Sequence, residues 1–456
     1  MLSGSSRRLR LLRLTTYGKV FESFNAPRII FRQNCWRKSS TTWYPPARGA
    51  LFFDFPKSVR AGDRQSTAHR DWAECVLSIP LDKRKVTEVY LDRLKTILTR
   101  SSPHSISVRL YQKGHAATAA SSTLVDAIIH SARRWRSLDL DLSRFELSQL
   151  EDLPPGTFET LETLSFHDLT QQTQAVTVFQ SSPRLRHLTL RPLYESASYF
   201  PLFLMPWSQL TLLNVSDSSL GGCRMMLMQC SNLQSAVLQT SHEWDFPVHT
   251  AASSVVPLPF LKTLTVTFSG RPADTIGGVE AFFIPLALPS LTKLDLTFDM
   301  DAYEDWPTEV FTDFQRRSPN IEEINLLYCT ITSQGFIAML RHASALTTLC
   351  VHNSWNCIDG DFFEALRYDR VGPAPLAPKL QDIDFWCVGD FEEHLFEEAI
   401  RSRWWKDDAL LSNASESPPS VVRLKTVSVG RDDSGSQNVS DELKVLVDEG
   451  LELYFS

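Results

Sequence analysis

The sequence has no run of about 18 apolar residues, the length that a membrane-spanning helix requires. One of the longest apolar segments, 199–207, is interrupted by Pro201 and Pro206. Glycine is also scarce, with 18 residues in 456, which excludes a collagen-like chain. Because 43% of the residues are hydrophobic and 22% are charged, a wholly disordered chain is excluded as well. The composition therefore predicts a folded protein without a membrane span.

The eight cysteines are spread thinly along the chain and form no C-x-x-C pair. Cys350 and Cys357, with His352 between them, come closest to a Cys/His cluster, but their spacing is not that of a structural zinc site. Disulfides are not required, because a chain of this length can bury a sufficient core. We therefore expect buried thiols in a reducing compartment and no metal site.

Catalytic and cofactor-binding motifs are also missing. Gly277-Gly278 is not followed by the Lys-Ser/Thr of a phosphate-binding loop, and no G-x-S-x-G or H-E-x-x-H motif occurs. His242-Glu243 and His394, which follows two glutamates, are isolated pairs of the kind found on solvated surfaces. The sequence thus predicts no catalytic residues, no cofactor and no metal, and a protein that is not an enzyme.

What the chain has in excess is leucine, and much of it falls in six-residue blocks of the form L-x-x-L-x-L. Eleven such blocks follow one another from about residue 135 onward, and most begin 23–30 residues after the previous one. Leucine-rich repeats have periods of about 20–29 residues, so the spacing indicates such repeats, with insertions in the later ones. The blocks begin at Trp135, Leu161, Leu185, Leu210, Leu233, Leu261, Leu291, Ile321, Leu346, Leu380 and Leu424.

The last three positions of each block alternate apolar, variable, apolar, as in a strand that buries one face. A proline turn such as Ser182-Pro183 or Leu288-Pro289 precedes many of these strands and ends the helix before it. The fold class predicted is α/β, a leucine-rich-repeat solenoid in which a curved parallel sheet is lined on its outside by helices, preceded by a small helical region. Helices are expected over 123–134, 223–230, 307–317, 333–342 and 391–403.

Three regions follow from this reading. Residues 1–50 form a basic, poorly ordered leader, and residues 51–100 form a helical region that leads into the repeats. Residues 101–456 form the solenoid, which has a polar loop near 406–420. A strand at 105–110 and a helix and strand over 442–455 are its expected capping ends, because a solenoid must cover its terminal apolar edges.

Two segments at the front of the repeats carry a family resemblance. Trp72–Pro80 reads W-A-E-C-V-L-S-I-P, with a Trp, an aliphatic pair and then Ser-x-Pro, and in Leu91–Leu110 a helix ends in a Ser-Pro turn before a short strand. Ala132–Leu142 and Gly450–Leu453 add a first repeat and a terminal strand. Over residues 70–456 the chain resembles the fungal F-box/leucine-rich-repeat proteins, which makes 51–100 an F-box remnant.

The resemblance implies the target-recognition subunit of an SCF-type ubiquitin ligase, with a cytoplasmic or nuclear location. In that family the F-box docks on a Skp adaptor and the repeats bind the target, so Trp72 would lie near the adaptor. The chain departs from the family where an F-box begins with Leu-Pro-x-Glu-Ile/Leu. Pro27–Phe31, P-R-I-I-F, stands there instead, so the front of the F-box is degenerate or missing.

The first fifty residues differ in charge from the rest. They hold ten Lys or Arg and a single acidic residue, Glu22, whereas the chain as a whole has a net charge of -7. Three interpretations stay open: a mitochondrial transit peptide, a disordered basic arm, or a wrongly joined first exon that replaced a genuine F-box. The first would make the chain a mitochondrial assembly or scaffold protein. Nucleic-acid binding is not expected, because the acidic body would repel phosphate.

The repeat register predicts which side chains line the concave face: those between and just after the strand leucines. We expect this face to bind a protein target that carries basic residues, with Trp386 as an aromatic anchor, and the chain to be a monomer. Among these residues, Asp139, Asp141, Asp295, Asp299, His352, Asp384 and Trp386 are the candidate binding residues. An alternative is that Trp386 packs beneath the insertion near 352–375. The predicted positions are Asp139, Asp141, Ser165, His167, Thr189, Arg191, Asn214, Ser216, Thr265, Thr267, Asp295, Thr297, Asp299, Asn325, His352, Asp384 and Trp386.

Overall fold

The structure is a computed structural model, and its described residues belong to one compact unit within 51–456. The predicted leader at 1–50, Trp72, Asp299 and most of the polar loop near 406–420 lie outside the described residues. The described ranges are 76–80, 88–111, 119–141, 149–167, 175–191, 203–240, 255–269, 278–298, 306–354, 357–386, 391–405, 419–430 and 440–455.

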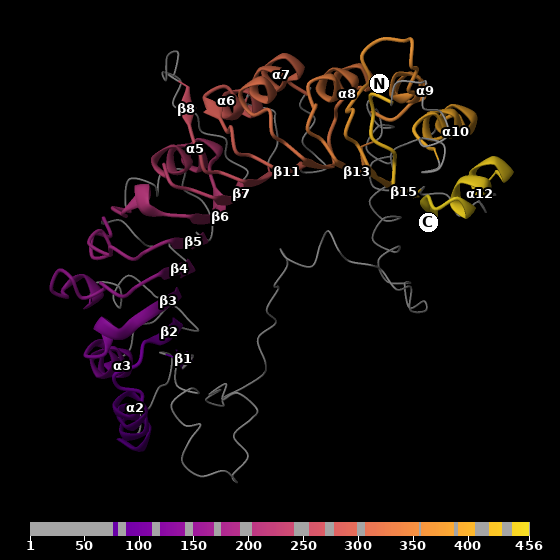
Figure 1. The fold of residues 1–456 in the computed structure, drawn as a ribbon. Coiled ribbons are helices and arrows are strands. Elements are labelled where there is room, and N and C mark those ends of the chain that lie inside the picture. The colour runs from indigo at the N-terminus through magenta and orange to yellow at the C-terminus, as the bar shows by residue number, and fades with distance from the viewer. Residues whose placement is uncertain are drawn as a thin grey trace, which may run out of the picture. The chain divides into compact units, whose positions relative to one another are not determined.

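Fourteen strands form one parallel sheet in which the strand order follows the chain. Figure 1 shows these strands side by side along an arc, with helices α5 to α10 on its outer side. The prediction of a curved parallel sheet in a leucine-rich-repeat solenoid is therefore confirmed. The strands are β1 (Val76–Pro80), β2 (Ile106–Tyr111), β3 (Trp135–Asp141), β4 (Thr163–His167), β5 (His187–Arg191), β6 (Leu212–Ser218), β7 (Ser235–Thr240), β9 (Thr263–Phe268), β11 (Lys293–Phe298), β12 (Glu323–Leu327), β13 (Thr348–His352), β14 (Asp382–Trp386), β15 (Thr426–Gly430) and β16 (Glu452–Phe455).

The sheet begins one strand earlier than the sequence reading placed it. Val76–Pro80 lies in the region predicted to be helical, but it is strand β1 and pairs in parallel with β2. The physical reason is its alternation: Leu77 and Ile79 are buried in the common core while their neighbours point away. Among the described residues of this region, Glu88–Arg100 form helix α2.

The strand register places the repeat leucines in two continuous buried rows. Leu138 of β3 pairs with Leu164 of β4, and Leu140 pairs with Phe166 two residues further along. The same two positions stay in line strand after strand as far as β15 and β16, where Val427 pairs with Leu453. All eleven sequence blocks lie at these positions, including the isolated one at Leu424, so the long interval before it is an insertion within the solenoid.

Helices and short segments cover the buried side of the sheet. The helices expected over 223–230, 307–317, 333–342 and 391–403 are present, each with ends shifted by up to three residues. Several helices begin at the residue types that cap N-termini: Ser219, Thr332, Asp359 and Ser440 each accept a backbone N–H from three residues later. The helices are α3 (Ala119–Ile129), α5 (Leu220–Gln229), α6 (Gly278–Phe283), α7 (Thr308–Arg317), α8 (Ser333–Arg341), α9 (Gly360–Leu366), α10 (Glu393–Ser402) and α12 (Asp441–Asp448).

Three arginines, each at or just after the end of a helix, form hydrogen bonds to the end of the preceding helix. Arg134 donates to the carbonyl oxygen of Leu98 at the end of α2, and Arg317 donates to the carbonyl oxygen of Phe283 at the end of α6. Arg403, after α10, donates to the carbonyl oxygen of Leu366 at the end of α9. The last carbonyls of a helix have no backbone partner within it, so these guanidinium groups supply donors there; the Leu98 oxygen also accepts the hydroxyl of Ser101.

Candidate protein-binding surface

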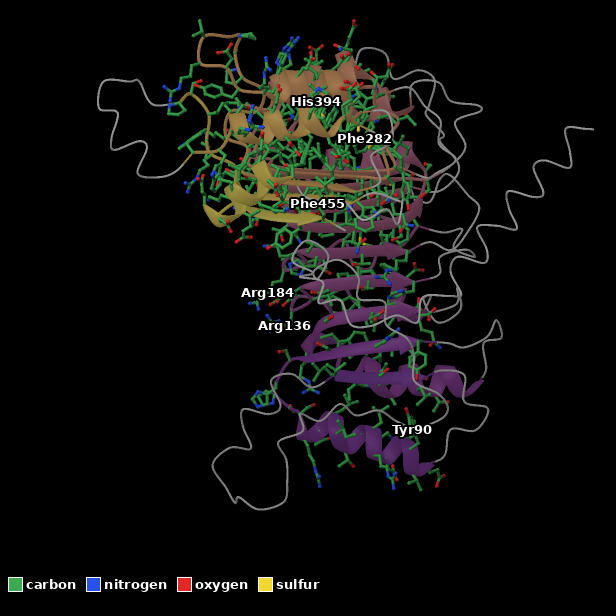
Figure 2. All side chains as sticks on the ribbon, turned by 90° about the vertical axis from the view of Figure 1, so that its right-hand side faces the viewer. Tyr90, Arg136, Arg184, Phe282, His394 and Phe455 are labelled. Atoms are coloured by element: carbon green, nitrogen blue, oxygen red, sulfur yellow. The ribbon has the colours of Figure 1, made fainter. Side chains whose placement is uncertain are left out.

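The face of the sheet opposite the helices, here called the concave face, carries three rows of outward side chains. Their strands are stacked one above another in Figure 2, which looks along a direction at right angles to Figure 1. One row lies between the two buried positions of each strand, one just before the first and one just after the second. The middle row runs Ser78, Arg109, Asp139, Ser165, Thr189, Asn214, Val237, Thr265, Asp295, Asn325, Cys350, Asp384, Ser428 and Tyr454, and within it Cys350 is buried by its neighbours.

At the N-terminal end of this face, Asp139 is at the centre of a small charged cluster. Its carboxylate lies 3.4 Å from Nε of Arg109 and 2.8 Å from Nε2 of His167. Asp141 follows on the same strand and is in register with His167. Arg191 on β5 is in register with His167, so two arginines and two aspartates face outward here and the cluster offers little attraction to a charged partner.

In the middle of the face, Asp295 is held by its neighbours on both adjacent strands. Thr265 Oγ1 donates to one carboxylate oxygen at 3.0 Å, and Asn325 Nδ2 donates to the other. Lys293 Nζ lies 3.6 Å from Asp295 and 2.5 Å from Oε1 of Glu323. Burial raises the pKa of the Asp295 carboxyl above its ordinary value, although the hydrogen bonds from Asn325 and Thr265 and the charge of Lys293 oppose that shift.

At the C-terminal end, the predicted residues His352, Asp384 and Trp386 are brought together. His352 and Trp386 are in register on β13 and β14, and Nε2 of His352 lies 3.2 Å from a carboxylate oxygen of Asp384. The backbone there is fixed, because Asn353, with φ of 52°, donates its N–H to the carbonyl oxygen of Trp386 at 2.8 Å. This part of the face is therefore a preformed surface with an aromatic side chain, a carboxylate and an imidazole.

The predicted residues do not form a single site. Asp139 and Asp141 are on β3, and Asp295 is on β11, six strands further along. At about 4.8 Å between adjacent strands, the two groups are roughly 29 Å apart along the sheet. The structure thus separates a balanced N-terminal group from a C-terminal group that contains Asp295, His352, Asp384 and Trp386.

Sequence reasoning missed several charged residues of the C-terminal group. Lys293, Glu323 and Asp382 lie in the row before the first buried position, which also points outward. The sequence does contain this information. The residue before the second leucine of each block is two positions away from the predicted middle residue, so it points to the same face of the strand. With this row added, strands β11 to β16 present one lysine against five acidic side chains, namely Asp295, Glu323, Asp382, Asp384 and Glu452.

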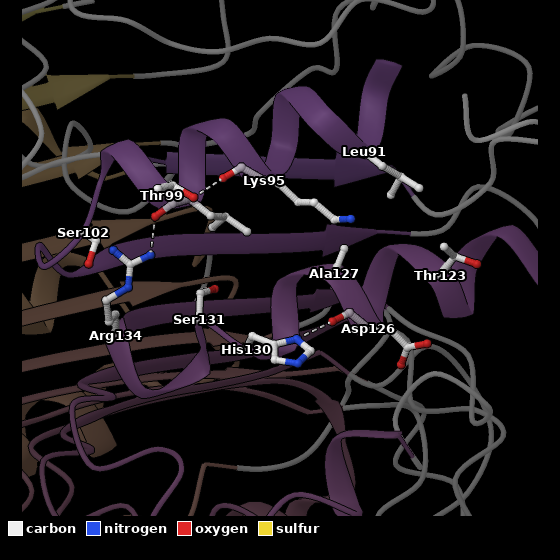
Figure 3. Close-up of a pocket in the computed structure, with 11 residues that line it drawn as sticks. Leu91, Lys95, Thr99, Ser102, Thr123, Asp126, Ala127, His130, Ser131 and Arg134 are labelled. Carbon is white, nitrogen blue, oxygen red and sulfur yellow. Dashed lines mark hydrogen bonds between the residues drawn. The ribbon is translucent and has the colours of Figure 1, made fainter. Parts of the chain in front are cut away.

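A second candidate is an open groove of about 700 Å³ between α2 and α3, shown in Figure 3. Several of its polar groups already have partners within the chain. Arg134 donates to the carbonyl oxygens of Leu98 and His104, at 2.9 and 3.2 Å, and His130 Nδ1 lies 3.0 Å from the carbonyl oxygen of Asp126. Because these groups already have partners, the groove offers a ligand less than the concave face does.

The cysteines that the structure describes are buried free thiols. Burial raises the pKa of the Cys223, Cys230 and Cys357 thiols to about 12, so they are protonated at neutral pH. Within the described ranges, no group of three or more Cys, His, Asp or Glu side chains is placed to hold a metal ion. In the same part of the chain, no helix has both the length and the apolar character needed to cross a membrane.

Comparison with known proteins finds no matching family model and no matching curated protein. Among solved structures, the chain is similar to one from the crystal structure of the Rad7 and Elc1 complex in yeast. The identity is 15%, the match covers 80% of this chain and 93% of that chain, and the TM-score is 0.32. A protein from Bacteroides fragilis matches with 14% identity over 82% of this chain and 72% of that chain, with a TM-score of 0.24. The fold assignment rests on this chain's own strand register.

Proposed function

We propose that the protein is a non-enzymatic interaction module that binds a basic segment of another protein on the C-terminal part of its concave face. The observation that supports it is the charge of strands β11 to β16, where five carboxylates face outward with one lysine. A partner with lysines or arginines would gain attraction there along a surface several strands wide. The N-terminal strands, in which Arg109 and Asp139 balance each other, contribute less.

The surface is also built to stay in place. Asp295 has its hydrogen-bonding neighbours on both flanking strands, and Trp386 is fixed through its backbone by Asn353. A preorganised surface loses little conformational entropy when a partner docks. These two features favour recognition of a partner over a purely structural role for the face.

Binding of defined peptides to the full-length protein tests the proposal. A fluorescent octapeptide with alternating glycine and basic residues should bind, and its glutamate counterpart should not. The variant Asp382→Lys/Glu452→Lys should weaken binding by about tenfold, since two attractive charges become repulsive. Raising the salt concentration should weaken binding by the wild-type protein, because these charges are partly exposed.

The matched control is Glu309→Lys/Asp313→Lys on α7, which makes the same change in net charge on the helical side. It should leave peptide affinity nearly unchanged. Equal losses for both variants would show that only net charge matters, and no basic-peptide binding at all would contradict the proposal.

The resemblance to F-box/leucine-rich-repeat proteins supports a finer role, as the target-recognition subunit of a ubiquitin ligase in the cytoplasm or nucleus. Copurification of a Skp-type adaptor with the full-length protein, and its loss with Trp72→Ala, would support that role. Import of a tagged chain into mitochondria with removal of its first residues would instead favour the scaffold alternative.

A further inference from the structure

Two aromatic side chains stand on alternate strands at the C-terminal end of the concave face. Trp386 is on β14 and Tyr454 on β16, and the strand between them, β15, has Gly430 in register with Trp386 and Ser428 in register with Tyr454. Two strand spacings separate the aromatic residues by about 10 Å across the sheet. Trp386 also stands two residues, about 7 Å, further along the strands than Tyr454, so the small residues of β15 form the floor of a diagonal slot, hereafter the Trp386–Tyr454 slot, with one aromatic side chain at each end.

Carboxylates surround this slot. Asp384 is in register with Ser428 on its floor, and Asp382 and Glu452 lie at equivalent positions on the two outer strands. One oxygen of Glu452 is 3.3 Å from the hydroxyl of Tyr454, so the acid and the ring are neighbours. The strand segments β14, β15 and β16 contain no lysine or arginine, so no cation of these strands neutralises the slot.

Both aromatic side chains reach the surface, Tyr454 as an exposed residue and Trp386 as a half-buried one, and both are anchored from beneath. Tyr454 is 49% exposed, while its neighbour Phe455 packs edge-on against Phe396 of α10, with ring centroids 6.3 Å apart. On the other side, the carbonyl oxygen of Trp386 accepts the N–H of Asn353. The rings can therefore receive a partner group without rearrangement of the strands that carry them.

We propose that the Trp386–Tyr454 slot receives an arginine side chain of the bound segment, an inference that rests on the proposed function and specifies its partner. A guanidinium group is planar, stacks on aromatic faces and pairs with carboxylates through two parallel hydrogen bonds. A lysine ammonium can use the carboxylates but stacks less well. The slot therefore distinguishes arginine from lysine, whereas the charge of the surrounding face does not.

Fluorescence anisotropy with two labelled peptides tests this on the full-length protein. The peptides are Gly-Ser-Arg-Gly-Ser-Arg-Gly-Ser and its counterpart with lysine at both arginine positions. The arginine peptide should bind about threefold more tightly, as expected for exposed cation–π contacts. The variant Trp386→Leu/Tyr454→Leu should bring the ratio close to one and leave the lysine affinity nearly unchanged.

A second variant, Ser428→Ile, fills the floor of the slot with an aliphatic residue that strands favour and should also abolish the arginine preference. Tyr111→Leu, on the concave face of β2, is the matched control and should keep it. Equal binding of the two peptides by the wild-type protein would overturn the slot while leaving the proposed function intact. Failure of both peptides to bind would overturn the two together.

Discussion

Arg403 donates its Nε–H to the carbonyl oxygen of Leu366 at 2.8 Å, across 37 residues of sequence. The same guanidinium reaches the carbonyl oxygens of Leu376 and Ala377, and the residue is 0% exposed. Burial lowers the pKa of Arg403 to about 10, so it remains charged at neutral pH. A single buried cation thus joins the end of α9, the loop after it and the end of α10.

Replacement of Arg403 by methionine should destabilise the protein. The variant keeps much of the apolar stem but removes the guanidinium donor from the carbonyl oxygens of Leu366 and Leu376, at a cost of about 2–4 kcal/mol, while Ala377 still accepts the N–H of Leu380. Urea denaturation followed by circular dichroism measures the shift in midpoint. Arg401→Met in the last turn of α10 is the control, because Arg401 is half-exposed and forms a surface pair with Glu442, which should matter little. A variant at Arg403 as stable as the wild type would contradict the role of this residue.

Asp295 makes the stability of the solenoid depend on pH in a predictable direction. Its pKa is raised in the folded protein, chiefly by burial, so the folded state holds the proton more tightly than the unfolded chain does. The stabilisation from this group is present below the ordinary aspartate pKa of about 4 and is lost as the pH rises through the raised folded value.

Comparison with Asp295→Asn isolates this contribution. The stability of the wild type relative to the variant should fall between about pH 4 and pH 7. Urea midpoints of both proteins at the two pH values give the difference. The amide has nearly the same shape as the carboxyl. If the stability of the wild type relative to Asp295→Asn stays constant or rises with pH, the carboxyl is not desolvated as the structure indicates.

The sequence predicted the solenoid well because its core obeys a local rule. Each strand buries two alternate apolar residues, and parallel pairing repeats those positions, so that Leu138 aligns with Leu164 without knowledge of the intervening loop. The first strand escaped prediction because Val76–Pro80 has the alternating pair but not the leucine that opens the other blocks. A repeat pattern therefore locates the strands inside the array well, and the strands at its ends less well.

The candidate site was predicted only in part. His352, Asp384 and Trp386 were found because register alone places them together. The slot beside Trp386 was not predicted, although a terminal strand was expected within 442–455, because the placement of Tyr454 beside Ser428 depends on the register of β16 against β15. The burial of Arg403 also could not be anticipated, because arginine is ordinarily exposed and its carbonyl partners lie 26 to 37 residues earlier in the chain.

The buried thiols should be inert in the native protein. With pKa values raised to about 12, Cys223, Cys230 and Cys357 contain little thiolate at pH 8, and their burial also blocks access. After incubation with iodoacetamide, peptide mapping by mass spectrometry should show these cysteines unmodified. The same treatment in urea should modify all three, which controls for detection of the peptides. Rapid native labelling of any of them would contradict the packing of the helical side.

Gly450 positions the terminal strand that carries Tyr454. It has φ of 111°, a conformation open to glycine and unfavourable for other residues, and it connects α12 to β16. Gly450→Ala should therefore lower stability by about 1 kcal/mol or more through backbone strain alone, since a Cβ there meets no atom within 4 Å. Asp448→Ala, an exposed change two residues earlier, should have little effect on the urea midpoint. If Gly450→Ala proved as stable as Asp448→Ala, the turn into β16, and with it the placement of the Trp386–Tyr454 slot, would have to be different from that described.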